Sequence, residues 1–186
     1  MKRIIVAALL TAIAIGASRI IAAQSAACAP SGGLSFICGV QAAEDLVLVP
    51  GTRWLIASGM TAGSGLHLID TQAKIARSLV SSNVSTTRAD KTKSAGCPGP
   101  LDPKQAVLHG LSLRPAQTGR YTLYATNHGG RESIEVFDVD ARSATPSASW
   151  TGCVLLPEKL AANSVAAFSD GALVATVLTL PLVSSS

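Results

Sequence analysis

Two of the three histidines in the chain, His109 and His128, lie nineteen positions apart, each at one end of an apolar, strand-like run. Imidazole exchanges protons near neutral pH, so a pair of histidines can supply a general base and a group that orients it. Glu44 and Asn163 also stand immediately before apolar runs. Carboxylate and amide oxygens are ligands that calcium prefers. This combination of residues predicts a hard-metal site with a base beside it.

The segments that carry these residues repeat one another. AEDLVLVPG with TRWLIASG, LHGLSLRP with GRYTLYATN, and ANSVAAFSDG with ALVATV each contain a polar pair, an apolar run, a turn and a second apolar run. The offsets from Glu44 to His109 and from His109 to Asn163 are 65 and 54 residues. Repeats of roughly fifty residues with several strands are typical of β-propeller blades. A β-sandwich is the alternative, because it is also built from short strands and turns.

In a propeller, the first strand of each blade lines the central channel. Glu44, His109 and Asn163 would then meet at one mouth of that channel. The strands that we expect are short apolar runs bounded by turn residues, at 45–49, 53–58, 66–70, 111–114, 121–126, 133–140, 165–168 and 172–177. His67, which alternates within LHLID, is expected to face solvent, whereas Trp54 and Trp150 are expected to pack in the interior.

Residues 1–27 have the composition of an export signal. MKR is a positively charged start, IIVAALLTAIAIGA is an apolar run, and small residues around AAQSAACA offer cleavage points. A membrane anchor is an alternative if Arg19 is tolerated near the end of the apolar stretch, and a lipid-modified Cys28 is another. We therefore expect an N-terminal signal helix or anchor over 1–27, a domain over 28–186, and a periplasmic or secreted protein.

Export affects how the cysteines and the charges are interpreted. No CxxC pair occurs, so in an oxidising compartment we expect two disulfides, with the pairing left open, among Cys28, Cys38, Cys97 and Cys153. Three of the 15 basic residues, and none of the 11 acidic ones, lie in 1–27, so the rest of the chain is nearly neutral. We therefore expect no nucleic-acid partner, and membrane contact only through the N-terminal segment.

Four pieces of the chain, in order from residue 43 to about 177, resemble the paraoxonase and arylesterase family. They are AEDLVLVPG, LHGLSL, LYATNHGGRESIEVFDVD and ANSVAAFSDG. The most specific feature is NH at the end of one strand with ESIEVF opening the next. Members of this family are six-bladed propellers, related to gluconolactonase-like and strictosidine-synthase-like proteins, that hydrolyse lactones and aryl esters with calcium. The resemblance implies a calcium-dependent hydrolase in which water attacks a carbonyl polarised by the metal.

The resemblance also implies a role for each polar residue at the mouth of the channel. His109 would be the general base that activates water. His128 would sit behind it, fix its tautomer and relay the proton. Glu44 and Asn163 would be ligands of the catalytic calcium. The substrate would be a small lactone or ester.

A second, structural calcium would be bound with the help of Asp45 and the carbonyl oxygen of Leu111. Ser164 stands where the family carries an acidic ligand of that ion. Residues 28–186 suffice for about two and a half blades of roughly fifty residues, so we expect a truncated propeller whose open sheet edges favour self-association. The alternative function is a non-catalytic, propeller-type binding or scaffold protein of the cell envelope.

Overall fold

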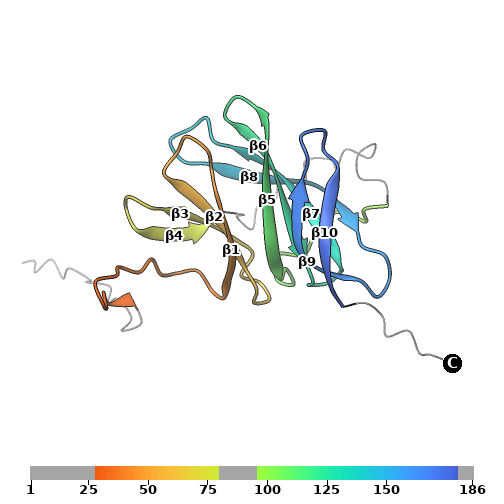
Figure 1. Cartoon of the computed structure of the whole chain (residues 1–186), viewed down its shortest axis with the longest axis horizontal. Coiled ribbons are helices and arrows are strands. Elements are labelled where there is room, and N and C mark those ends of the chain that lie inside the picture. Colours follow the sequence, from red (N-terminus) through yellow and green to blue (C-terminus); the bar gives the residue numbers. More distant parts are fainter. Residues whose placement is uncertain (1–27, 80–95, 180–186) are drawn as a thin grey trace, which may run out of the picture.

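The computed structural model of the chain describes residues 28–79 and 96–179, and the expected export signal lies outside them. Within these residues the protein is all-β, as expected, with ten strands in three antiparallel sheets (Figure 1). No helix in 28–79 or 96–179 has the length and apolar character that crossing a bilayer requires.

Each sheet is formed by consecutive strands that pair with their neighbours in the chain. The first sheet contains β1 (Ala43–Leu48), β2 (Trp54–Gly59), β3 (Leu66–Asp70) and β4 (Ile75–Ser78). The second contains β5 (Leu108–Gln117), β6 (Arg120–Asn127), β7 (Ser133–Asp140) and β8 (Ser147–Leu155). The third is the pair β9 (Ala161–Ala167) and β10 (Leu173–Thr179).

Most strands lie where the apolar runs predict them, and the expected runs 66–70 and 133–140 coincide with β3 and β7. Two strands, β4 and β8, were not expected. Polar residues interrupt their apolar patterns, since β4 reads IARS and β8 begins SAS. The expectation for His67 was wrong: all five residues of β3 are buried, because β3 is covered on both faces and not on one.

The main core lies between the first two sheets. Its buried members come from both of them and include Ile56, Leu66, Leu68, Leu108, Leu123 and Val139. Trp54 and Trp150 belong to this core, as expected. A smaller cluster of Tyr124, Ile134 and Val165 joins the second sheet to the third. The three sheets therefore pack in the order in which they occur in the chain.

Two disulfides link the four cysteines, pairing Cys28 with Cys38 and Cys97 with Cys153. The second of these ties the segment before β5 to β8, the last strand of the second sheet. Two disulfides are compatible with an exported protein in an oxidising compartment.

The first strands of the three sheets lie side by side, with β5 in contact with both β1 and β9 (Figure 1). Glu44, His109 and Asn163 are among the first three residues of β1, β5 and β9 respectively. These residues therefore lie within the strands, at their beginnings, whereas the sequence predicts that they stand just before the strands. This arrangement brings together residues that are more than fifty positions apart in the chain.

Candidate functional site

An irregularity in strand pairing occurs at three of the predicted site positions, 44, 109 and 163. Regular antiparallel pairing sets one residue opposite one residue. In β1, however, Glu44 and Asp45 together face the single residue Ser58 of β2. Such a β-bulge bends the strand and turns a side chain in a new direction, and bulges are common next to active sites.

The same irregularity recurs in the other two sheets. In β5, His109 and Gly110 together face Thr126 of β6. In β9, Asn163 is the extra residue, and the residue after it pairs with Thr176 of β10. Each of the three first strands thus has one extra residue at the position of the acid, the imidazole or the amide.

A hydroxyl side chain faces each of these irregularities, namely Ser58, Thr126 and Thr176. Each hydroxyl bonds to the backbone of the irregular strand: Asp45 N donates to Ser58 Oγ at 3.0 Å, Thr126 Oγ1 donates to Gly110 O at 3.5 Å, and Ser164 N donates to Thr176 Oγ1 at 3.1 Å. A bulge leaves backbone groups without ladder partners, and the hydroxyls satisfy some of them. The recurring LIAS, LYAT and LVAT in the sequence is the signal for these three residues.

The structure brings Glu44 and His109 together. Oε1 of Glu44 lies 3.7 Å from Nδ1 of His109, with side-chain exposures of 29% and 13%. The distance exceeds that of a hydrogen bond, and within the described chain Nδ1 is buried without a hydrogen-bond partner. A carboxylate at this distance stabilises a positive charge on the ring.

His128 lies against His109. Their ring centroids are 4.7 Å apart and the rings are nearly perpendicular, at 84°. His128 follows the last residue of β6, and its backbone N–H donates to the carbonyl of Val107 at 3.0 Å. Its Nδ1 lies 2.8 Å from Oε2 of Glu132. Glu132, which is not among the site residues predicted from the sequence, therefore fixes the orientation of the second imidazole.

Asp45 and Leu111, which were expected to share a structural calcium, are in direct contact. Oδ2 of Asp45 accepts the backbone N–H of Leu111 at 2.7 Å, and Oδ1 accepts that of Leu46 at 2.7 Å. The carboxylate therefore joins β1 to β5. Both of its oxygens already accept a hydrogen bond from the backbone.

Asn163 lies beside β5 because the two backbones approach very closely. A Cβ atom at Gly110 would lie 2.5 Å from Cα of Ser164 and 2.7 Å from the carbonyl oxygen of Asn163, so only glycine fits there. That carbonyl also accepts a hydrogen bond from Thr126 Oγ1 at 3.2 Å. The Asn163 side chain is half-buried. The structure thus sets Asn163 next to the residue that follows His109.

The donors at this site fit calcium only in part. Glu44 and Asn163 carry oxygens of the right kind, but calcium takes six to eight oxygen ligands. In the described ranges no group of three or more His, Cys, Asp or Glu side chains is placed to hold a metal ion. Asp45 fits less well than expected, because backbone N–H groups occupy its oxygens.

The site therefore consists of a carboxylate, two imidazoles in contact and a second carboxylate, at the junction of three first strands. In comparisons with protein-family models, with curated proteins and with solved structures, no match to this chain was found.

Proposed function

We propose that the three sheets are successive blades of a β-propeller, and that the chain hydrolyses lactones or aryl esters with His109 as the general base. The observation that carries the proposal is the series Glu44, His109, His128 and Glu132, in which each side chain contacts the next. The bulges support it, because β1, β5 and β9 each have an irregularity in pairing at Glu44, His109 or Asn163.

In the proposed reaction His109 takes a proton from a water molecule. The resulting hydroxide attacks the carbonyl carbon of the substrate, and a tetrahedral oxyanion forms. The bond between the carbonyl carbon and the ester oxygen then breaks, and the leaving oxygen receives the proton from His109. A lactone gives a hydroxy acid, and an aryl ester gives a carboxylic acid and a phenol.

The residues around His109 support both stages of this cycle. Glu44 stabilises the imidazolium that exists between the two proton transfers, because its carboxylate lies 3.7 Å away. His128 confines the ring by contact along its edge, and Glu132 holds His128 in place. His128 and Glu132 are therefore positioning residues.

Calcium belongs to this proposal as a bound ion. Glu44 and Asn163 would hold it, together with water molecules. When bound, calcium polarises a carbonyl group and stabilises an oxyanion. The steps assigned above to His109, His128 and Glu132 do not depend on its position.

A non-catalytic binding or scaffold role is the second candidate, and Asp45 favours it. Its carboxylate joins β1 to β5 through backbone N–H groups, as a structural residue would. Under this alternative the polar pairs at the strand starts serve the packing of neighbouring sheets. In either case we propose a periplasmic or secreted location, which the two disulfides support.

The test is turnover of phenyl acetate and of a δ-lactone by the purified protein, with added calcium and with a chelator. We expect His109→Gln to lower kcat/KM by about 10²- to 10⁴-fold, which is the usual contribution of a general base. His67→Gln is the matched control, because His67 is a buried histidine of the first sheet that the mechanism does not use.

Activity that His109→Gln leaves intact would refute the assignment of the base. Turnover that is unchanged by the chelator but lost in His109→Gln would remove calcium from the proposal and keep the hydrolase. Calcium-dependent thermal stability without turnover of either substrate would favour the scaffold role.

A further inference from the structure

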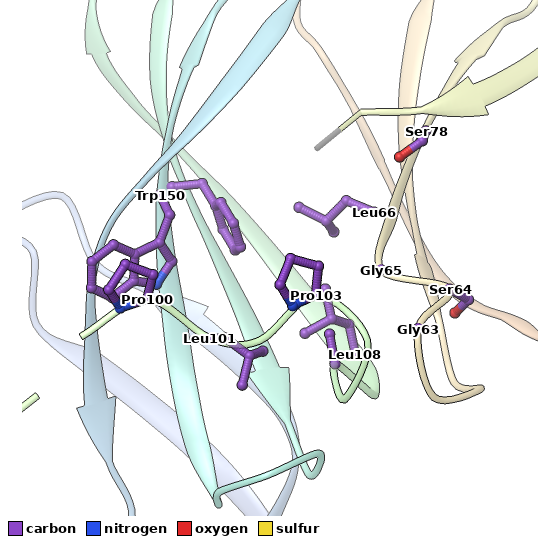
Figure 2. A pocket seen from close by; sticks show the side chains of 12 residues that line it. Gly63, Ser64, Gly65, Leu66, Ser78, Pro100, Leu101, Pro103, Leu108 and Trp150 are labelled. Carbon is purple, nitrogen blue, oxygen red and sulfur yellow. The ribbon is translucent and has the colours of Figure 1, made fainter. Parts of the chain in front are cut away.

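An apolar cavity of about 70 Å³ lies between the first two sheets. Figure 2 shows its walls, to which β3 contributes Leu66, β5 contributes Leu108, and β8 contributes Trp150. Phe137 of β7 also lines it. None of the residues of the candidate hydrolytic site lines this cavity, so the two sites are separate.

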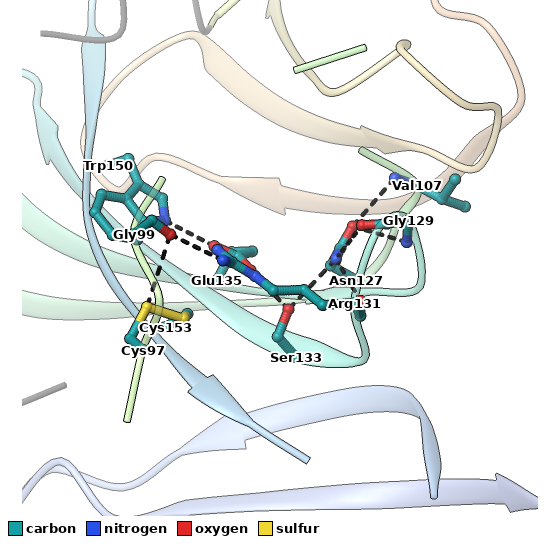
Figure 3. A network of polar contacts seen from close by, with 10 residues as sticks. All are labelled: Cys97, Gly99, Val107, Asn127, Gly129, Arg131, Ser133, Glu135, Trp150 and Cys153. Carbon is teal, nitrogen blue, oxygen red and sulfur yellow. Dashed lines mark hydrogen bonds and ion pairs between the residues drawn. A yellow bond between two sulfur atoms is a disulfide. The ribbon is translucent and has the colours of Figure 1, made fainter. Parts of the chain in front are cut away.

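The segment before β5 closes one side of the cavity with Pro100, Leu101 and Pro103 (Figure 2). Two connections at its start hold this segment in place. Cys97 is bonded to Cys153 of β8, and the carbonyl of Gly99 accepts a hydrogen bond from Arg131 Nη1 at 2.8 Å (Figure 3). Prolines further restrict the backbone. These connections hold the wall formed by this segment in place.

The aromatic wall is fixed as well. The indole N–H of Trp150 donates to Oε2 of the fully buried Glu135 at 2.7 Å, and Glu135 is paired with Arg131 at 2.8 Å (Figure 3). Because its one polar atom is bonded on that side, Trp150 offers carbon atoms to the cavity. Among the described lining residues no side chain is charged.

We propose that this cavity binds a small apolar compound that contains a ring. Its volume is several times the ~10–15 Å³ that one water molecule needs, and a lining that is mainly apolar favours an apolar guest. Trp150 and Phe137 favour a flat ring, which gains contact with aromatic side chains. The lack of charged lining residues selects against ions, since a buried charge requires a partner.

The experiment uses toluene as the apolar probe and benzoate as its charged counterpart. The chain has two tryptophans, so the Trp54→Phe variant leaves Trp150 as the single tryptophan, whose emission can be excited apart from that of tyrosine. We expect toluene to change the emission of Trp150 saturably and to raise the Tm by a few degrees, because a ligand that binds only the folded state stabilises it. We expect benzoate to do neither.

The control is a variant in which the cavity is filled. Ala106 is buried and lines the cavity, so Ala106→Leu should abolish both effects of toluene. If this variant does not fold, Leu101→Phe on the closing segment serves the same purpose. The absence of any effect of toluene on the unfilled protein would overturn the proposal. So would an equal effect in the filled variant, or an equal effect of benzoate. None of these outcomes depends on hydrolysis, so the proposal stands or fails independently of the proposed function.

Discussion

The carboxylate oxygen Oε1 of Glu44 lies 3.7 Å from Nδ1 of His109, although 65 residues separate the two in the sequence. The contact depends on the packing of β1 against β5. That packing is fixed by the next residue, Asp45, whose carboxylate accepts the backbone N–H of Leu111. Asp45 thus joins the first two sheets, and Glu44 faces the imidazole of His109.

The first prediction concerns Glu132, which holds His128 through a 2.8 Å contact. We expect Glu132→Gln to lower kcat about 10-fold or more, because a freed second imidazole no longer orients His109. The pH dependence of kcat should also change, and a loss of folding alone would not produce that change. The measurement is a pH–rate profile with phenyl acetate, with Glu158→Gln at an exposed position as the control. An unaltered profile would contradict the role of Glu132.

The second prediction concerns Gly110, at the close approach of β5 and β9. Gly110→Ala should lower the free energy of unfolding by about 1–3 kcal/mol, because the added methyl group overlaps the backbone of Ser164. Urea unfolding measures this quantity. Gln117→Ala, at an exposed position in the same strand, should have little effect. Equal stability of the two variants would mean that the strands are further apart than described.

The third prediction compares the two disulfides. Loss of Cys97–Cys153, which are 56 positions apart, should lower the free energy of unfolding by about 4 kcal/mol, because a long closed loop restricts the unfolded chain strongly. Loss of Cys28–Cys38, which are 10 positions apart, should cost about 3 kcal/mol or less by the same relation. Double alanine variants and urea unfolding test this, and the reverse order would contradict it.

The fourth prediction concerns the buried ion pair of Arg131 and Glu135. Glu135 has no exposed surface and also accepts hydrogen bonds from Ser133 and Trp150. Arg131→Met should cost about 3–5 kcal/mol, because it leaves a buried carboxylate without its cation. Replacing both members, as Arg131→Met with Glu135→Leu, should cost less than the single change. A cost below about 1 kcal/mol for Arg131→Met would identify the pair as an ordinary surface ion pair.

The fifth prediction is a pH dependence that arises from His67. Burial lowers the pKa of His67 below its ordinary value, and an interaction with the backbone of Ser64 opposes that shift without reversing it. The unfolded chain therefore binds a proton more readily than the folded protein, so stability falls as pH decreases through about 6.5. His67→Gln should remove this part of the pH dependence. Urea unfolding between pH 7.5 and 5.5 measures the slope, and an identical slope in wild type and variant would refute it.

The sequence predicts the strands well where apolar residues form uninterrupted runs. β3 and β7 match their expected ranges because LHLID and SIEVFDVD lie between clear turn residues. β4 and β8 were missed because edge strands tolerate polar residues, so their apolar pattern is weak. Burial of His67 could not be predicted from alternation, because alternation assumes a sheet with one solvated face.

The sequence predicts which positions form the candidate site, but it does not predict which side chains contact one another there. Aligning the three repeats is enough to show that positions 44, 109 and 163 are equivalent. The contact of His128 with Glu132 depends on the conformation of the connection between β6 and β7. The use of Asp45 as a link between β1 and β5 depends on the direction of its side chain at the bulge. Repeated sequence does not determine those directions. The disulfide pairing likewise required the fold, since four cysteines allow three pairings.

The bulge faced by a hydroxyl residue occurs once in each sheet, with different residues on it: an acid pair in β1, histidine and glycine in β5, and asparagine in β9. The shape of the backbone at the bulge therefore depends little on which side chain stands there. An exchange at position 44, 109 or 163 can therefore change the side chain that is presented there while the scaffold folds as before. That separation makes these three positions a natural place to engineer new chemistry.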